Sequence, residues 1–324
     1  MATIRQWGGT AESALPQGTS RLDSAEGVLF LRQAEVLVPR VLQQPKPALN
    51  FERYIPVDGS IAPWANQITE RVADSYGAAG IISGGEESFP RIDVGLKENT
   101  TRQAWVGASA CYTLKEIQQA QALGTELNAR MIDACRRAIM EKVNTIAFYG
   151  DAAANLKGLV QTPNALRSVA ANPISSASTA AQIEAVLNAG VNHAPNATEQ
   201  VEETDTLLLP PAEFQYISQT RSGTATDATI KDFWGGSNGY IAAPNIFLVR
   251  ELRNAQILTG GAETSSDVAI FYRREEEVLM LPFSGIIPLP PLQTGPMSFE
   301  LPFYAAVGEV ILRRPRAVHI VQGV

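Results

Sequence analysis

The chain has 324 residues, a formal net charge of −7 and 18% charged residues, below the roughly 25% that is typical of globular domains. This length is enough for one large or two ordinary domains, and the acidic balance argues against a general nucleic-acid binder, which would carry a basic face. The low charged fraction indicates a surface that is largely covered, which favours an oligomer. Two cysteines are too few for a disulfide framework, and no stretch approaches the ~20 apolar residues of a membrane span.

Residues 1–50 are predicted to form an extended arm without a core of its own. Glycines, prolines and polar residues surround one apolar piece there, GVLFLRQAEVLVPRVL. The first residues lack the apolar run of a secretory signal peptide, so no such signal is expected. The following QQPKPALN contains two prolines, which fix φ and block a helix. Such an arm has to lie on something else, either its own subunit or a neighbouring one.

A long β-hairpin is predicted next. The runs QITERVADS and FPRIDVGLKENTTRQAWVGASA show strand signals, with Ile92, Val94 and Leu96 on one face of the second run. Between the runs lies a glycine-rich tip, YGAAGIISGGEES. Because a long two-stranded hairpin is marginal in isolation, we expect contacts from other subunits to support it.

One long helix is predicted from residue 113 to about 148. Thr113 and Glu116 match the capping-box pattern, and apolar residues then recur at spacings of three and four. At about 1.5 Å per residue this helix would be roughly 50 Å long. Gly124 falls inside it, where a glycine costs about 1 kcal/mol relative to alanine. A helix of this length in a mixed domain is expected to act as a structural spine.

Helices and strands alternate from about residue 165 to 300, which indicates a second, α/β part of the chain. Ser178 is predicted to cap a helix, TDTLLLPP to form a buried strand, and Pro211 to open the next helix. TIKDFWGGSNGY is predicted to be a loop, IFLVREL a strand, and DVAIFYRREEEVLMLPF a strand pair or a strand with a charged bend. The proline-rich segment that follows, FSGIIPLPPLQTGPMS, is predicted to be irregular. The strand-rich end, FELPFYAAVGEVILRRPRAVHIVQG, is expected to rejoin the sheet of the first part.

The segment AFYGDAAANLKGLVQTPN, residues 147–164, raises the question of a phosphate-binding loop. A phosphate loop follows a strand and opens a helix, whereas this segment follows the long helix, and Lys157 precedes Gly158. Gly150 fits the left-handed position that ends a helix. The segment is therefore predicted to be a joint between two parts of the chain.

The sequence predicts no catalytic, cofactor or metal site. Its two histidines, His193 and His319, fall in different elements, and no spacing adds cysteines or carboxylates to them as zinc ligands. A Ser-His-Asp or Cys-His site would have to use one of the two, and no GxSxG nucleophile elbow is present. Structural histidines with satisfied hydrogen bonds are the favoured interpretation.

Clusters of charge are the candidates for contacts between subunits. Arg273 and Arg274 directly precede the run Glu275–Glu277, and a mixed-sign run of this kind forms either a solvated bend or salt bridges across subunits. The basic run near residue 314 is expected to pair with acidic groups of a neighbour, because no aromatic residue interleaves it for stacking on nucleic acid. The predicted inter-subunit contacts are Tyr76, Gly77, Gly84, Gly85, Glu86, Glu87, Arg273, Arg274, Glu275, Glu276, Glu277, Arg313, Arg314 and Arg316.

The order of these elements, from about residue 35 to 324, resembles the major capsid proteins of tailed bacteriophages with the Hong Kong 97-type fold. It is especially similar to the branch related to encapsulin-type shells. The resemblance is carried by three segments: YIPVDGSIAPWANQITERVADSYGAAGIISGGEESFPRIDVGLKENTTRQAWVG, YTLKEIQQAQALGTELNARMIDACRRAIMEKVNTIAFYGDAAANLKGLVQTPN and GEVILRRPRAVHIVQG.

The resemblance implies an α+β fold in four parts. These are an N-terminal arm over 1–50; a peripheral domain over 51–66, 106–165 and 300–324, with the spine helix 113–148; an extended loop over 67–105; and an α/β axial domain over 166–299. Some members cross-link a loop lysine to a distant asparagine. Lys97 is the only lysine of this loop, and a single lysine is no motif for that chemistry.

The function implied is structural and not enzymatic: an icosahedral shell around double-stranded DNA, built from hexamers and pentamers of this chain, without sequence-specific DNA contact. The resemblance implies portal, scaffold and decoration proteins as partners. It implies the virion capsid as the location, with the host cytoplasm during assembly, and it implies no membrane contact. An encapsulin-like compartment that packages an enzyme is the alternative, and a soluble α/β enzyme with a site near His193 or His319 is a second one.

Overall fold

The computed structural model describes residues 45–77, 79, 91–124, 127–223, 227–259 and 262–324, and the statements below concern these residues. Most of the predicted arm, residues 1–44, lies outside them. Residues 49–324 form one compact unit. Among the described helices, none is long and apolar enough to cross a membrane.

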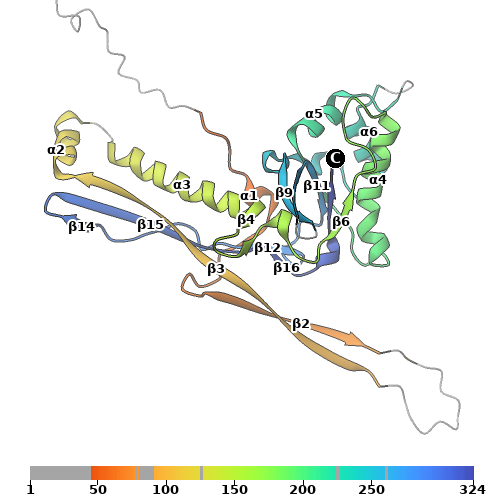
Figure 1. Ribbon diagram of the computed structural model, residues 1–324, viewed down its shortest axis with the longest axis horizontal. Helices are drawn as coiled ribbons and strands as arrows, with labels where there is room; N and C mark the ends of the chain where they lie inside the picture. The colour runs from red at the N-terminus through yellow and green to blue at the C-terminus, as the bar shows by residue number, and fades with distance from the viewer. Residues whose placement is uncertain (1–44, 78, 80–90, 125–126, 224–226, 260–261) are drawn as a thin grey trace, which may run out of the picture. The chain divides into compact units, whose positions relative to one another are not determined.

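The predicted hairpin is confirmed (Figure 1). Strand β2 (Gln67–Tyr76) pairs antiparallel with β3 (Asp93–Thr113), from Gln67 opposite Arg102 to Tyr76 opposite Asp93. The other half of β3 pairs with β15 (Ser298–Gly308), a late strand that rejoins the first part of the chain, as the sequence predicts. The short strands β13 (Ile287–Pro288) and β14 (Leu292–Gly295) pair with β15 within the segment predicted to be irregular.

The prediction of one continuous helix over 113–148 is wrong. Two helices are present, α2 (Leu114–Leu123) and α3 (Leu127–Tyr149). The predicted capping box at Thr113 and Glu116 is confirmed, but Gly124 is left-handed, with φ 61°, and its N–H donates to Ala120 O, which ends α2. Helix α3 packs on β3 and β15 through an apolar stripe that includes Ile139, Val143 and Ile146.

A five-stranded sheet, which contains β6 and β11, lies beside the layer formed by α3, β3 and β15 (Figure 1). Its strand order is β6-β17-β11-β7-β8. Its strands are β6 (Leu166–Val169), β17 (Val318–Gln322), β11 (Val268–Tyr272), β7 (Thr206–Leu209) and β8 (Ile246–Leu248). Side chains alternate between its faces, so that Ile270 belongs to the core of α3 while the next residue, Phe271, belongs to a second core. One sheet therefore separates two hydrophobic cores.

Three helices cover the second face: α4 (Ala180–Ala197), α5 (Pro211–Gln219) and α6 (Ile230–Ser237). The helix opened by Pro211 is as predicted, whereas α4 is capped by Thr179 and not by Ser178. The prediction of a loop for TIKDFWGGSNGY is wrong, because most of this segment forms α6. The side chain of Thr229 accepts a hydrogen bond from Asp232 N and caps the start of that helix. Buried Trp234 then anchors that helix despite two glycines.

The remaining elements are small. They are α1 (Phe51–Tyr54), β1 (Val57–Asp58), β4 (Gly150–Asp151), β5 (Leu156–Lys157), β9 (Ala255–Thr259), β10 (Ala262–Ser266), β12 (Leu279–Pro282) and β16 (Ile311–Leu312), with 3-10 turns at Leu159–Gln161, Ala243–Asn245, Arg250–Leu252 and Pro315–Ala317. The run predicted as a strand pair or as a strand with a charged bend forms two strands that lie in different sheets. Strand β11 lies in the five-stranded sheet, and β12 pairs with β1 and β16.

The segment 147–164 is a joint and not a phosphate loop. Gly150 ends α3 with φ +77°, as predicted, and β4 and β5 then form a tight antiparallel pair. The carboxylate of Asp151 accepts from Ala153 N and from Lys142 Nζ, and the Lys142 contact holds the pKa of Asp151 below its usual value. The chain leaves this turn toward β6.

The domain boundaries stay a prediction. Residues 300–324 were assigned to the peripheral domain, but β17 pairs with β11 and β6, which belong to the predicted axial range. The five-stranded sheet therefore contains strands from both sides of the boundary predicted at residue 300.

Candidate interface residues and a basic cleft

The end of the hairpin carries the first group of predicted contact residues. Tyr76 is exposed at the last pair of β2, and Gly77 follows it, with its Cα facing Ile92 across the turn. Gly84, Gly85, Glu86 and Glu87 lie outside the described residues.

One face of this hairpin is apolar and exposed. Ile92, Val94 and Leu96 are 69%, 59% and 75% exposed, and they share one face because Asp93 and Gly95 separate them along the chain, as the sequence predicts. The opposite face carries Glu70 and Lys97, because side chains alternate across a strand. An aligned row of large apolar side chains in solvent is a candidate binding surface.

The two charge clusters predicted as separate contacts lie side by side. Strand β12 pairs with β16, and the N–H of Arg313 donates to Val278 O at 2.9 Å, so the bend at 273–277 lies next to the basic run. Within one chain, Arg273 pairs with Glu275 at 2.7 Å, and Arg314 pairs with Glu277 at 3.3 Å and with Glu202 at 3.2 Å. Arg274 and Glu276 are exposed.

Arg313 joins the hairpin to this network. Its guanidinium donates to both carboxylate oxygens of Glu70 on β2, with the shortest contact at 2.7 Å, and to the backbone oxygen of Glu276 at 2.8 Å. The hydrogen bond to Glu70 raises the pKa of Arg313. The sequence did not indicate Glu70 as its partner, because the two residues are 243 positions apart.

Breaking this pair is expected to loosen the base of the hairpin. A double-mutant cycle with Arg313→Ala and Glu70→Ala should give a coupling free energy of about 1–2 kcal/mol, because the contact is bidentate and partly buried. The measurement is denaturant unfolding of the four proteins. The control cycle is Arg71→Ala with Glu98→Ala, a pair 77% and 57% exposed, with an expected coupling below about 0.5 kcal/mol. Equal coupling in both cycles would contradict the structural role of Arg313.

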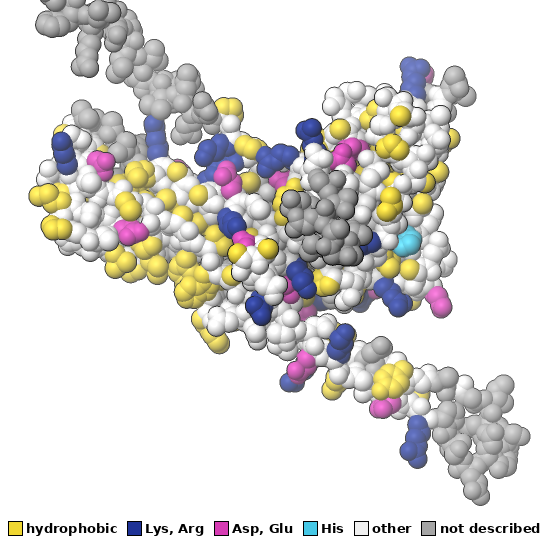
Figure 2. All heavy atoms as spheres, viewed as in Figure 1, with side chains coloured by type: hydrophobic (Ala, Val, Ile, Leu, Met, Phe, Trp, Pro, Cys, Tyr) yellow, Lys and Arg dark blue, Asp and Glu magenta, His cyan; other side chains and the backbone are white. Residues whose placement is uncertain are grey.

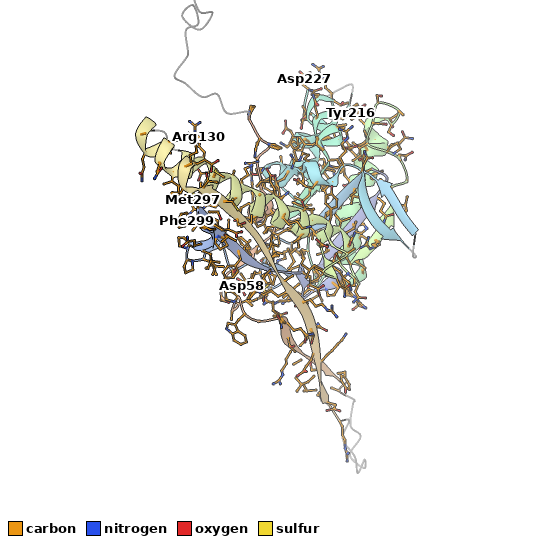
Figure 3. All side chains as sticks on the ribbon, turned by 60° about the vertical axis from the view of Figure 1, so that its left-hand side comes forward. Asp58, Arg130, Tyr216, Asp227, Met297 and Phe299 are labelled. Carbon is orange, nitrogen blue, oxygen red and sulfur yellow. The ribbon has the colours of Figure 1, made fainter. Side chains whose placement is uncertain are left out.

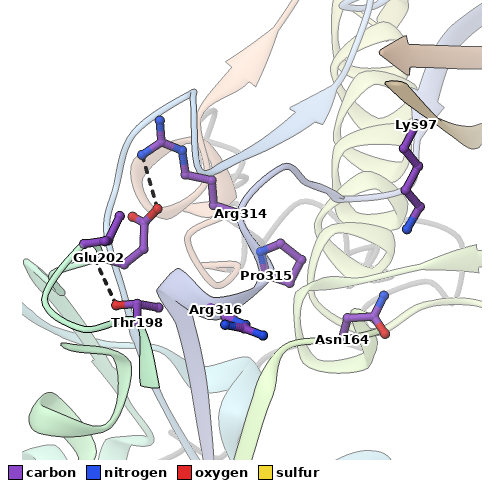
Figure 4. A pocket seen from close by; sticks show the side chains of 8 residues that line it. Lys97, Asn164, Thr198, Glu202, Arg314, Pro315 and Arg316 are labelled. Carbon is purple, nitrogen blue, oxygen red and sulfur yellow. Dashed lines mark hydrogen bonds and ion pairs between the residues drawn. The ribbon is translucent and has the colours of Figure 1, made fainter. Parts of the chain in front are cut away.

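A basic cleft opens beside this network (Figure 4). Lys97 from β3, Arg314, Arg316 and Glu202 line a cavity of about 760 Å³, together with Asn164, Thr198, Val201 and Pro315. Glu202 is buried and accepts from Arg314, and its backbone N–H donates to the Thr198 hydroxyl at 3.0 Å. Three cations and one carboxylate give the cleft an excess of positive charge.

The two histidines, far apart in sequence, meet in the structure. Their rings stack with centroids 4.1 Å apart, His193 on α4 and His319 on β17. The Nδ1 of His319 donates to Gly190 O at 3.0 Å, since a carbonyl only accepts, and its Nε2 lies 2.8 Å from the Ser168 hydroxyl. Burial lowers the pKa of His319 to about 4, so the ring is neutral near pH 7. The low pKa makes it a poor general base, and both nitrogens are satisfied, as the sequence favoured.

Other perturbed groups do not gather into a reactive site. Burial and the neighbouring Asp267 raise the pKa of Glu213 on α5, and burial raises the pKa of Glu309. Within the part of the chain that the structure describes, no group of three or more His, Cys, Asp or Glu side chains could hold a metal ion.

A further exposed apolar edge lies at the β14–β15 end. Hydrophobic side chains gather along this edge in Figure 2, and exposed Leu292 and Met297 belong to it. Figure 3 shows Met297 and Phe299 at the same end as Arg130 of α3. The sequence does not predict this edge, because the proline-rich segment FSGIIPLPPLQTGPMS was expected to be irregular.

The chain matches the family model described as "Major capsid protein" over residues 77–324. No curated protein sequence matches it.

Solved capsid structures share its fold at low sequence identity. The capsid of Myoviridae phage XM1 has a TM-score of 0.77 at 13% identity, covering 92% of this chain and 99% of that chain. The match to Mycobacterium phage Cain has a TM-score of 0.60 at 16% identity, and it covers 93% of this chain and 98% of that chain. The match to the capsid of an empty GTA particle has a TM-score of 0.62 at 8% identity, and it covers 93% of this chain and 99% of that chain. These matches confirm the fold class expected from the sequence.

Proposed function

The chain belongs to the major capsid protein family, and from this premise we propose that its copies assemble, as hexamers and pentamers, into the icosahedral shell of a tailed bacteriophage around double-stranded DNA. A structural role and a place in the virion capsid follow from the family. An enzymatic role gains no support from His319, because this buried ring is hydrogen-bonded through both nitrogens within the fold.

In the proposed shell, the hairpin lies over a neighbouring subunit of the same capsomer. The exposed row Ile92, Val94 and Leu96 carries this proposal, because covering large apolar side chains in a heterologous contact removes them from water. The α/β part, 166–299, would gather around the five- and six-fold axes, and the arm would lie along an adjacent subunit. The predicted contact residues at the hairpin tip and in the two charge clusters would lie in these interfaces.

Portal, scaffold and decoration proteins are proposed as partners, with assembly in the host cytoplasm. The net charge of −7 fits an inner surface that holds DNA without sequence-specific contact and without a tight electrostatic grip.

Shell formation is the direct test. Purified chain, alone and co-expressed with its genomic neighbours, is expected to give shells or capsomer rings in negative-stain electron microscopy. A monodisperse monomer or dimer under every condition would overturn the proposal. Nucleic acid in isolated shells would support a virus shell, and a packaged enzyme would support a compartment.

Shortening the hairpin is expected to block assembly without unfolding the subunit. Deleting residues 77–85 removes most of the tip and leaves the β2–β3 pairs intact, so circular dichroism should be unchanged while shells disappear. Shells of normal yield from the deletion variant would refute the role assigned to the hairpin.

A further inference from the structure

Two cations of the basic cleft lack an acidic partner among the described residues. Lys97 and Arg316 are both exposed and line the cleft, but neither forms an ion pair within the described chain. Arg314 differs, because Glu202 and Glu277 already offset its charge. The excess positive charge of the cleft therefore comes from Lys97 and Arg316.

The cleft is open to a segment of chain and built from fixed elements. Lys97 projects from β3 on the face that also carries Glu70, and Arg313 ties that face to the basic run. Arg316 lies in the short turn that leads into β17. A volume of about 760 Å³ admits several side chains, and its lining is polar apart from Val201 and Pro315. The natural occupant is a short segment with carboxylates.

The sequence offers few such segments. Adjacent acidic residues occur at Glu86–Glu87, Glu202–Glu203 and Glu275–Glu277. Glu202, Glu275 and Glu277 already pair with arginines of their own chain. Glu86 and Glu87 stand in the stretch SGGEES, and their sequence neighbours are serine and glycine.

We propose that the basic cleft receives the Glu86–Glu87 pair of a neighbouring copy, with Lys97 and Arg316 as its counter-charges. This inference rests on the proposed function, because it needs a hairpin that reaches an adjacent subunit. It gives the hairpin a charge-based contact in addition to its apolar row. Electrostatic complementarity of this kind fixes the register of a contact more than it adds raw affinity.

Charge reversal tests the pairing. Lys97→Glu with Arg316→Glu, and separately Glu86→Lys with Glu87→Lys, should each lower the yield of shells by more than about tenfold, since like charges then face each other. Combining all four substitutions in one chain should restore the yield. The variant Lys97→Arg with Arg316→Lys keeps the charges and should assemble normally.

Co-expression of the two reversed chains separates a contact between copies from one within a copy. Each chain then offers a tip that matches the cleft of the other, so mixed hexamer rings, in which the two chains can alternate, should form. Two chains cannot alternate around a pentamer, so recovery in the mixture is scored on hexamer rings and not on closed shells. Recovery in the four-substitution chain without recovery in the mixture would place the contact within one copy and overturn the proposal. So would normal shells from either reversed chain, or no recovery in the combined chain. Parental chain that never forms shells would instead defeat the proposed function.

Discussion

Alanine in place of Gly158 is expected to lower the free energy of unfolding by about 3 kcal/mol or more. Gly158 has an ordinary φ of −91°, so the cause is space and not backbone strain. A Cβ there would lie 2.4 Å from Gly150 N and 2.5 Å from the carbonyl of Phe148. Both are backbone atoms at the end of α3, and they cannot move aside as a flexible side chain can. The joint would have to open, and the measurement is denaturant unfolding followed by tryptophan fluorescence.

Gly236→Ala is the matched control. Gly236 lies exposed on α6, where a Cβ would meet no heavy atom within 4 Å. The same substitution should there be neutral or stabilising by up to about 1 kcal/mol, because alanine favours helix over glycine. Similar losses at the two sites would show that the close approach of Gly158 to Gly150 does not limit stability.

Acidification is expected to destabilise the fold through His319. Its folded pKa of about 4 is below the ordinary 6.5, so the neutral ring is favoured in the folded state. The free energy of unfolding that this preference contributes is fully present above pH 6.5 and is lost as the pH falls toward 4. The difference corresponds to about 3 kcal/mol for this residue, which is 1% exposed. Unfolding measured at several pH values should show this loss.

His319→Gln isolates the contribution of this residue. Glutamine carries a donor and an acceptor for Gly190 and Ser168 but does not titrate, so the loss between pH 7 and 4.5 should shrink by about 2–3 kcal/mol. His193→Gln removes the stacked ring and keeps His319, so most of the loss should persist. An unchanged pH dependence in His319→Gln would mean that other groups dominate the acid response.

The elements predictable from the sequence were those with a local chemical cause. The capping box at Thr113, the proline that opens α5 and the left-handed Gly150 each act within a few residues of themselves. Gly124 shows the limit of such inference. A glycine inside a helical pattern either is tolerated or ends the helix, and the apolar period continues on both sides in either case.

Contacts between distant segments were beyond sequence reasoning. His193 and His319 meet because β17 enters the five-stranded sheet beside α4, which the separate elements did not indicate. Glu70 meets Arg313 because β16 lies near the base of the hairpin. The charged residues themselves were identified as candidates, but their partners depend on the topology, and a single sequence does not contain that information.

The position of β17 has a consequence for synthesis. This strand lies between β6 and β11, and β6 pairs with no other described strand. A nascent chain therefore carries β6, β7, β8 and β11 for some time before residues 318–322 emerge to join them. Until then two strand edges stay open and can pair with other chains. Completion of the sheet waits for residues 318–322, so a nascent chain in which they have not yet emerged lacks the finished wall between its two cores.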